Sequence, residues 1–118
     1  MFFKIINTFK FSFSSYKIDK PELIDPKSSS SILSIKNAIA SGNPIFLAMS
    51  PMPSTLSKAW GKYLWEPTSN EENNEMGHAM VIIAYSDYKF GGAFQILNSY
   101  GKLWGDKGKI WIRYSDLL

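Results

Sequence analysis

The spacing of apolar and polar positions changes several times along the chain, and each change predicts an element. From residue 3 to residue 13, aromatic and β-branched residues nearly alternate with polar ones, which predicts a half-buried strand. Residues 14–31 contain Pro21 and Pro26 and end in four serines, a composition typical of a loop. The N-terminal quarter is therefore predicted as one strand followed by a long loop.

The next segment has the period of a helix. Apolar residues between positions 32 and 40 fall on one helical face, and Ser30 or Ser31 can cap the start. Gly42, followed by a proline, is an ordinary stop signal. The short apolar run at residues 44–49 then predicts a buried strand.

The connection formed by residues 50–77 is long, and loops of this length in compact domains are usually functional or flexible. Its centre contains Trp60, Tyr63 and Trp65, and its tip is acidic and polar. These aromatic side chains could line a ligand groove, or they could clamp the loop onto the sheet. We favour the clamp.

Two apolar runs, residues 79–85 and 93–98, predict neighbouring strands. The connection between them contains a Gly-Gly pair and suits a hairpin, so the strands should pair antiparallel. Residues 109–114 alternate and predict a last strand. We therefore expect an α+β fold in a single domain, 1–118, whose mostly antiparallel sheet of about five strands curls into a small barrel with one flanking helix.

One histidine and one asparagine stand at the ends of these paired runs. His78, the only histidine of the chain, opens the first run, and Asn98 closes the second. Taken singly, such a histidine is more often structural and such an asparagine more often a turn residue. Together they suggest a base and its orienting group, because a carboxamide oxygen that accepts from one ring nitrogen leaves the other free for proton transfer. An aromatic residue such as Tyr100 could keep water away from that hydrogen bond.

The composition excludes several classes of function. A net charge of +3 without a dense basic patch gives no support for nucleic-acid binding. No apolar run approaches the roughly 20 residues of a membrane helix, and lysines interrupt the apolar N-terminus where a signal peptide would be uninterrupted. The absence of cysteine excludes disulfides and thiolate chemistry by this chain alone, and leaves the cellular compartment open. We expect no cofactor and no metal.

Several segments of the chain resemble the papain family of cysteine peptidases. Residues 77–79, Gly-His-Ala before an apolar strand, resemble the segment with the family's catalytic histidine. Residues 98–108 read Asn-Ser-Tyr-Gly-x-x-Trp-Gly-x-x-Gly and resemble the family motif Asn-Ser-Trp-Gly-x-x-Trp-Gly-x-x-Gly. Residues 35–45 resemble the helix-to-strand element before the family's barrel, and residues 91–94 look most like bacterial members. The resemblance implies the papain-like fold of the C-terminal, barrel half.

The resemblance also implies catalytic roles. His78 would act as general base and acid toward a cysteine thiolate, and Asn98 would orient its ring. Tyr100 stands where the family has tryptophan and would shield that pair, with Trp104 in a supporting position.

Three further positions would bind substrate. Ala48 and Ala79 match positions that line the family's S2 specificity pocket, where small side chains leave room for an apolar residue of the peptide. Gly77, beside them, stands where many members carry Asn or Asp.

The family's first half, which supplies the cysteine and an oxyanion-hole glutamine, has no counterpart in these 118 residues. One hypothesis is therefore a peptidase fragment or subunit, inactive alone, that hydrolyses peptides when a Cys-bearing N-terminal half is supplied in cis or in trans. Its inner sheet face would be a large apolar interface. The alternative is a catalytically dead pseudopeptidase that binds peptides, and a weaker one is a generic barrel whose aromatic residues bind another ligand. We favour the first.

Overall fold

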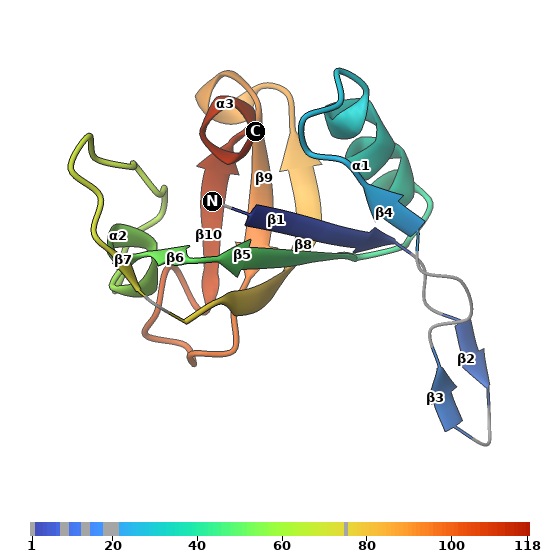
Figure 1. The fold of residues 1–118 in the computed structure, drawn as a ribbon, viewed down its shortest axis with the longest axis horizontal. Coiled ribbons are helices and arrows are strands. Elements are labelled where there is room, and N and C mark those ends of the chain that lie inside the picture. The colour runs from blue at the N-terminus through green and yellow to red at the C-terminus, as the bar shows by residue number, and fades with distance from the viewer. Residues whose placement is uncertain (1, 8–9, 13–14, 18–21, 75) are drawn as a thin grey trace.

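β-strands dominate the computed structural model, which describes residues 2–7, 10–12, 15–17, 22–74 and 76–118. Six of them form an antiparallel sheet in the order β10-β9-β8-β5-β1-β4 (Figure 1). These strands are β1 (Phe2–Asn7), β4 (Glu22–Ile24), β5 (Ile45–Ser50), β8 (His78–Ser86), β9 (Ala93–Leu97) and β10 (Lys109–Arg113).

Two smaller strand pairs lie outside the main sheet: β2 (Lys10–Ser12) with β3 (Ser15–Lys17), and β6 (Met52–Pro53) with β7 (Asn73–Asn74). The helices are α1 (Ser31–Ala40), α2 (Ser54–Ser57) and α3 (Tyr114–Leu117), with a 3₁₀ turn η1 (Lys89–Gly91) between β8 and β9. The fold class is α+β with an antiparallel sheet, as predicted.

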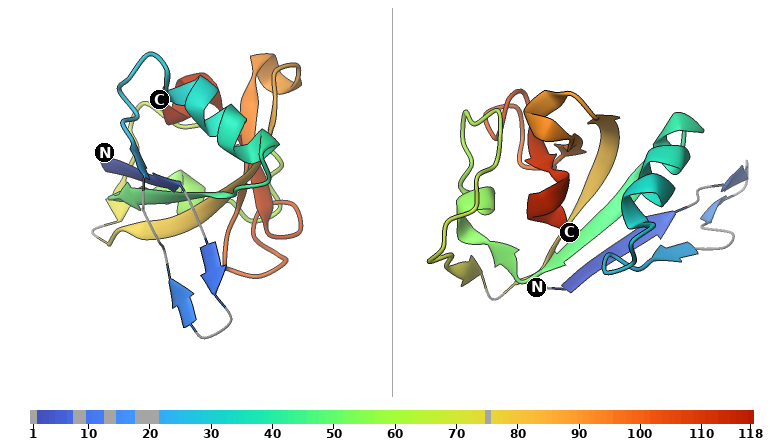
Figure 2. Two further views of the ribbon diagram at one scale, coloured as in Figure 1. Left: turned by 90° about the vertical axis from the view of Figure 1, so that its right-hand side faces the viewer. Right: turned by 90° about the horizontal axis from the view of Figure 1, so that it is seen from above.

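The main sheet is antiparallel, as expected, but it is open among the described residues and does not curl into a barrel, and it has six strands where we expected about five. β8 forms the bend: its first half pairs with β5 and its second half with β9. The register shifts between Ile82 and Ala84, and such a bulge increases the local twist. β1 and β5 consequently run across the direction of β9 and β10 (Figures 1 and 2).

The N-terminal prediction is wrong in detail. Instead of one strand from residue 3 to residue 13, β1 ends at Asn7, a poor strand residue, and β2 belongs to a separate pair. The predicted loop at residues 14–31 contains β3 and β4, which are too short to produce a recognisable period. The predicted half-burial of residues 3–13 concerns side chains that lie outside the described part of the structure.

Helix α1 begins at the predicted place but without the predicted cap. Ser30 is the N-cap residue, yet its side chain makes no capping hydrogen bond. The C-terminal signal is confirmed: Gly42 has φ +82°, and the N–H groups of Gly42 and Asn43 donate to the carbonyls of Ile39 and Ala38, each at 2.9 Å. This is a Schellman ending, which needs the left-handed residue that glycine supplies.

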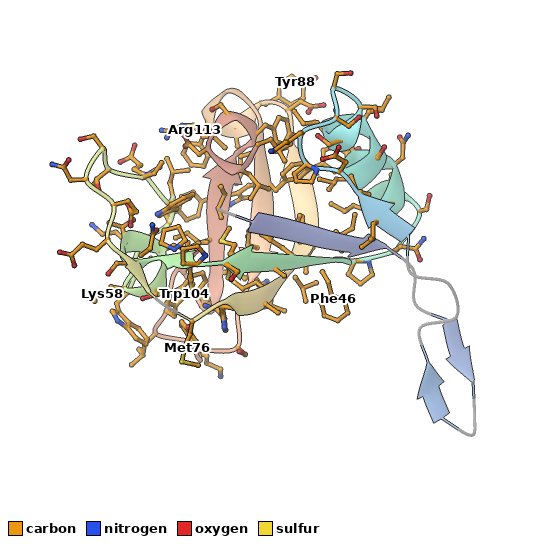
Figure 3. All side chains as sticks on the ribbon, in the orientation of Figure 1. Phe46, Lys58, Met76, Tyr88, Trp104 and Arg113 are labelled. Atoms are coloured by element: carbon orange, nitrogen blue, oxygen red, sulfur yellow. The ribbon has the colours of Figure 1, made fainter. Side chains whose placement is uncertain are left out.

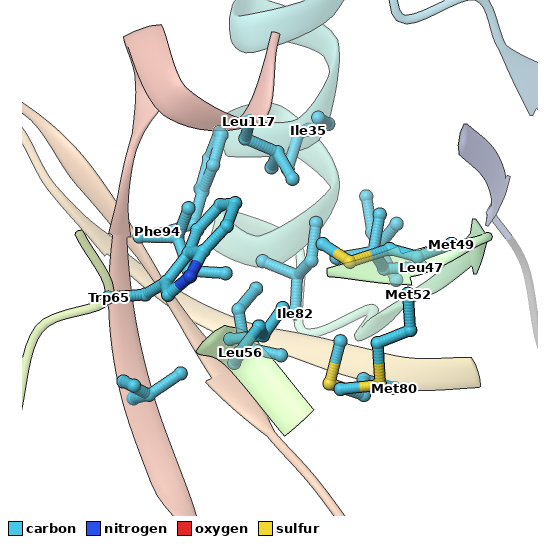
Figure 4. Packing of buried hydrophobic residues seen from close by; sticks show 14 of the residues in the cluster. Ile35, Leu47, Met49, Met52, Leu56, Trp65, Met80, Ile82, Phe94 and Leu117 are labelled. Carbon is cyan, nitrogen blue, oxygen red and sulfur yellow. The ribbon is translucent and has the colours of Figure 1, made fainter. Parts of the chain in front are cut away.

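The core lies on one face of the sheet and is covered by the chain itself (Figure 4). Alternate residues of the central strands point into it, and α1, α2, α3 and the connection before β8 close over them. The core cluster includes eight fully buried residues of the main sheet: Ile45, Leu47, Met49, Ile82, Phe94, Ile96, Ile110 and Ile112. For the strands whose side chains are described, this inner face is a covered core, so the expectation that it would form a large apolar interface is wrong.

Asp87 joins three elements at one end of the sheet. Its carboxylate accepts a hydrogen bond from Lys36 Nζ of α1 at 2.7 Å and one from the Tyr114 hydroxyl of α3 at 2.8 Å. The Lys36 bond, followed by the Tyr114 bond, lowers the pKa of Asp87 below its ordinary value. Burial and the bond to Asp87 raise the pKa of Tyr114.

This arrangement predicts a pH-dependent contribution to stability. Because the pKa of Asp87 is lower in the folded than in the unfolded chain, its contribution is present above the ordinary carboxyl value of about 3.9 and lost as the pH falls below it. Asp87→Asn should therefore destabilise the chain in urea at about pH 7, with a smaller difference at about pH 3. Asp106→Asn is the control, since its side chain bonds to no described residue. If Asp87→Asn lowers the free energy of unfolding by the same amount at both pH values, the prediction is wrong.

Candidate functional site

The fold brings His78 and Asn98 into direct contact. His78 is the first residue of β8, Asn98 follows the last residue of β9, and these strands are neighbours in the sheet. His78 Nε2 lies 2.7 Å from Asn98 Oδ1, and that oxygen also accepts the N–H of Ser99 at 2.7 Å. A carboxamide oxygen can only accept, so Nε2 must donate. In the neutral ring the proton is therefore on Nε2 and Nδ1 is the unprotonated nitrogen. No described residue hydrogen-bonds to Nδ1.

Burial strengthens this contact. Asn98 is 8% exposed and His78 is half-buried, so the carboxamide is largely removed from competing water. Asn98 Nδ2 is also buried and has no hydrogen-bond partner among the described residues. The amide is therefore fixed through its oxygen, which is the atom that orients the imidazole.

Tyr100 covers the pair. Its ring stacks on the imidazole of His78 with centroids 4.6 Å apart and an interplanar angle of 30°. Its hydroxyl lies 3.7 Å from Met52 Sδ, and its ring meets Trp104 edge-on at 6.2 Å. Tyr100 thus lies over the imidazole in the position predicted for a shielding residue.

Trp104 anchors the segment that follows Asn98. It is completely buried, and its indole Nε1 donates to the carbonyl of Leu56 in α2 at 3.0 Å. The next residue, Gly105, has φ +59°, and a Cβ there would collide with the carbonyl oxygen of Lys109. The Trp-Gly pair of the motif is therefore required by packing, whatever its relation to catalysis.

The predicted substrate-binding residues lie close by on the sheet. Ala48 and Ala79 are directly paired across β5 and β8, and the adjacent pair is Met49 with His78. Alternation turns both alanines away from the buried face, leaving Ala48 half-buried and Ala79 exposed. Gly77 is exposed, and a Cβ there would lie 3.1 Å from the Met49 carbonyl oxygen, tighter than most contacts.

The aromatic centre of the long connection mainly clamps it to the sheet. Trp65 is buried, and its N–H donates to the Trp111 carbonyl at 2.9 Å while the N–H of Trp111 donates to the carbonyl of Tyr63 at 3.0 Å. These bonds pair the connection with the edge of β10. Trp60 and Tyr63 keep exposed side chains. Met76, just before Gly77, is exposed as well (Figure 3).

Sequence reasoning missed the role of Glu71, which was assigned only to the acidic, polar tip of the long connection. Its carboxylate accepts hydrogen bonds from the backbone and hydroxyl of Thr55, at 2.7 and 2.6 Å, and from those of Thr68, both at 3.2 Å. Burial opposes ionisation, but these hydrogen bonds outweigh it and lower the pKa of Glu71. No local sequence signal joins residues 55 and 71.

A shallow cavity of about 450 Å³ lies beside α2, and none of the predicted site residues lines it. Its lining comprises Ser54, Thr55, Lys58, Ala59, Lys62, Asn70 and Glu72. Across the described parts of the chain, no group of acidic and histidine side chains could hold a metal ion. The helices described there are too short or too polar to cross a membrane.

Comparison with known proteins adds no relative to this picture. No protein-family model matches the chain, and no curated protein matches it significantly. The functional interpretation therefore depends on the residues and contacts described above.

Proposed function

We propose that this chain is the His/Asn half of a papain-like cysteine peptidase and that its fold is that of the family's C-terminal half. The observation that carries the proposal is the 2.7 Å hydrogen bond between His78 Nε2 and Asn98 Oδ1, shielded by the stacked ring of Tyr100. The geometry is that of a base with its orienting group.

The chemistry needs a cysteine from a second half, in cis or in trans. Nδ1 of His78 accepts the thiol proton, the thiolate attacks the peptide carbonyl carbon, and the imidazolium then gives its proton to the departing amine. In the second stage Nδ1 takes a proton from water as the water oxygen attacks the acyl carbon, and the C–S bond then breaks. The leaving thiolate regains its proton from the imidazolium, which restores the neutral ring. Asn98 keeps the ring oriented through both stages because its oxygen binds Nε2 throughout.

A row of apolar side chains on the outer sheet face supports a partner half. Cross-strand pairs place Phe46 beside Val81, Val81 beside Leu97, and Ala48 beside Ala79. Ala79 and Leu97 are exposed and the others half-buried. The row is contiguous, and Ala79 and Leu97 are the chain neighbours of His78 and Asn98. It is a suitable surface for a Cys-bearing half and for an apolar residue of the substrate.

A second candidate is a pseudopeptidase that binds peptides without cleaving them. It is favoured by the closed core, because a chain that covers its own inner sheet face needs no second half to fold. It also needs no nucleophile, and this chain has no cysteine.

Recovery of the protein from its native source distinguishes the two. For the peptidase, intact masses should reveal a longer polypeptide or a partner with a cysteine that iodoacetamide alkylates, and this assembly should hydrolyse a fluorogenic peptide. The purified 118-residue chain should hydrolyse none. Recovery alone, at its own mass and with measurable peptide affinity, would favour the binding module. Hydrolysis by the chain alone, abolished by His78→Ala, would contradict both candidates.

A further inference from the structure

We propose that Glu71 is a positioning residue for His78, acting through the strand pair β6–β7. The inference deepens the proposed function, because the position of His78 matters to catalysis only if His78 is the base. The hydrogen bonds that support it are made by Glu71 and lie outside the His78–Asn98 pair.

Glu71 fastens the tip of the long connection to the start of α2. One carboxylate oxygen accepts both bonds from Thr55, and the other accepts both bonds from Thr68. Thr55 Oγ1 in turn accepts the indole Nε1–H of the buried Trp65 at 2.9 Å. A carboxylate with four donors in this arrangement is a rigid junction, since charge-assisted hydrogen bonds are stronger than neutral ones.

The strand pair beside this junction leads to the site by two routes. The N–H of Ser54 donates to the carbonyl of Glu72 at 2.7 Å, directly next to the pairing of β6 with β7. Along the chain, β7 ends at Asn74, four residues before His78. Across the fold, Met52 of β6 contacts the Tyr100 hydroxyl, and Tyr100 stacks on His78.

Both routes meet at the imidazole. A loosened β6–β7 pair would free the entry of the chain into β8 and remove the support beneath Tyr100. The hydrogen bond from Nε2 to Asn98 would then compete with other ring orientations. We therefore expect loss of the Glu71 junction to change the tautomer of His78. The effect would be indirect, because Glu71 and His78 are seven positions apart in sequence and no described hydrogen bond joins them.

The single histidine makes this measurable in the isolated chain. Ring ¹⁵N chemical shifts, recorded on the neutral-ring plateau of a pH titration, should show one tautomer with the proton on Nε2 in the wild type. In Glu71→Gln, whose amide turns two donors toward Thr68, the other tautomer should rise to about 10% or more, with broadened ring signals. Glu72→Gln is the control: it makes the same change of charge at the neighbouring position and should leave the spectrum unchanged.

The outcomes separate the two proposals. A destabilised Glu71→Gln that keeps one sharp Nε2–H tautomer would show that Glu71 only braces the loop, and would overturn the inference alone. A wild type without the Nε2–H form would overturn the His78–Asn98 pair and, with it, any positioning role. If Glu71→Gln does not fold, Thr68→Val serves as the test, because it removes one hydroxyl donor to Glu71. It should raise the population of the other tautomer by a smaller amount. An unchanged spectrum of Thr68→Val would reject the inference.

Discussion

The His78→Ala variant of the proposed peptidase assembly is expected to lose about 100- to 10,000-fold in kcat/KM, the range that a general acid–base group contributes. The reason is that Nδ1 is the one ring nitrogen left available when Nε2 donates to Asn98 at 2.7 Å. The measurement is hydrolysis of a fluorogenic peptide under single-substrate steady-state conditions. The assembly must be the one recovered with its cysteine, because this chain supplies none.

Asn98→Ala should give an intermediate loss in the same assay. The base remains, but it loses the hydrogen bond that orients its ring and keeps the stack with Tyr100. Tyr88→Ala is the control, because that side chain is 97% exposed and touches neither partner of the pair. A His78→Ala assembly with wild-type kcat/KM would reject the catalytic assignment, whereas equal losses in all three variants would indicate failed assembly.

Trp104→Ala is expected to be the most destabilising single change in the loop after β9, at about 3–5 kcal/mol. The indole is completely buried in the core cluster, so its removal leaves a cavity. It also removes the 3.0 Å hydrogen bond from Nε1 to the Leu56 carbonyl, which keeps only the N–H of Ala59 at 3.2 Å. Because small proteins are stable by only about 5–15 kcal/mol, this loss would leave the chain near unfolding.

The adjacent residue provides the matched control for urea denaturation. Leu103 is 81% exposed, so Leu103→Ala should change the free energy of unfolding by no more than about 0.5 kcal/mol. Trp104→Phe should fall between the two, since it keeps most of the ring but loses the hydrogen bond to Leu56. Equal stabilities of Trp104→Ala and Leu103→Ala would show that this loop is not integrated with the core.

Local periodicity was enough to predict the centre of the sheet. The apolar runs that became β8 and β9 lie next to each other in sequence with a short turn between them, so their pairing needed no long-range information. The contact of His78 with Asn98 followed from the same pairing, because each residue stands at one end of its strand. Their catalytic role remains a prediction.

What could not be predicted depends on contacts between distant residues. β4 is three residues long and is defined by its pairing with β1. A strand this short has no hydrophobic period that could predict it from the sequence. Glu71 likewise resembled its solvated acidic neighbours, and only the fold brings it to Thr55, sixteen positions away. The open form of the sheet, too, depends on which strands meet after folding rather than on the strands themselves.

The backbone bonds between the long connection and β10 have a consequence for self-association. An exposed edge strand offers unpaired N–H and C=O groups to other chains and is a common starting point for aggregation. Here the bonds of Trp111 with Tyr63 and Trp65 already occupy part of that edge. Growth of an intermolecular sheet from β10 would first require the connection to detach, so fibril formation from that side should be limited by local unfolding rather than by encounter of folded molecules.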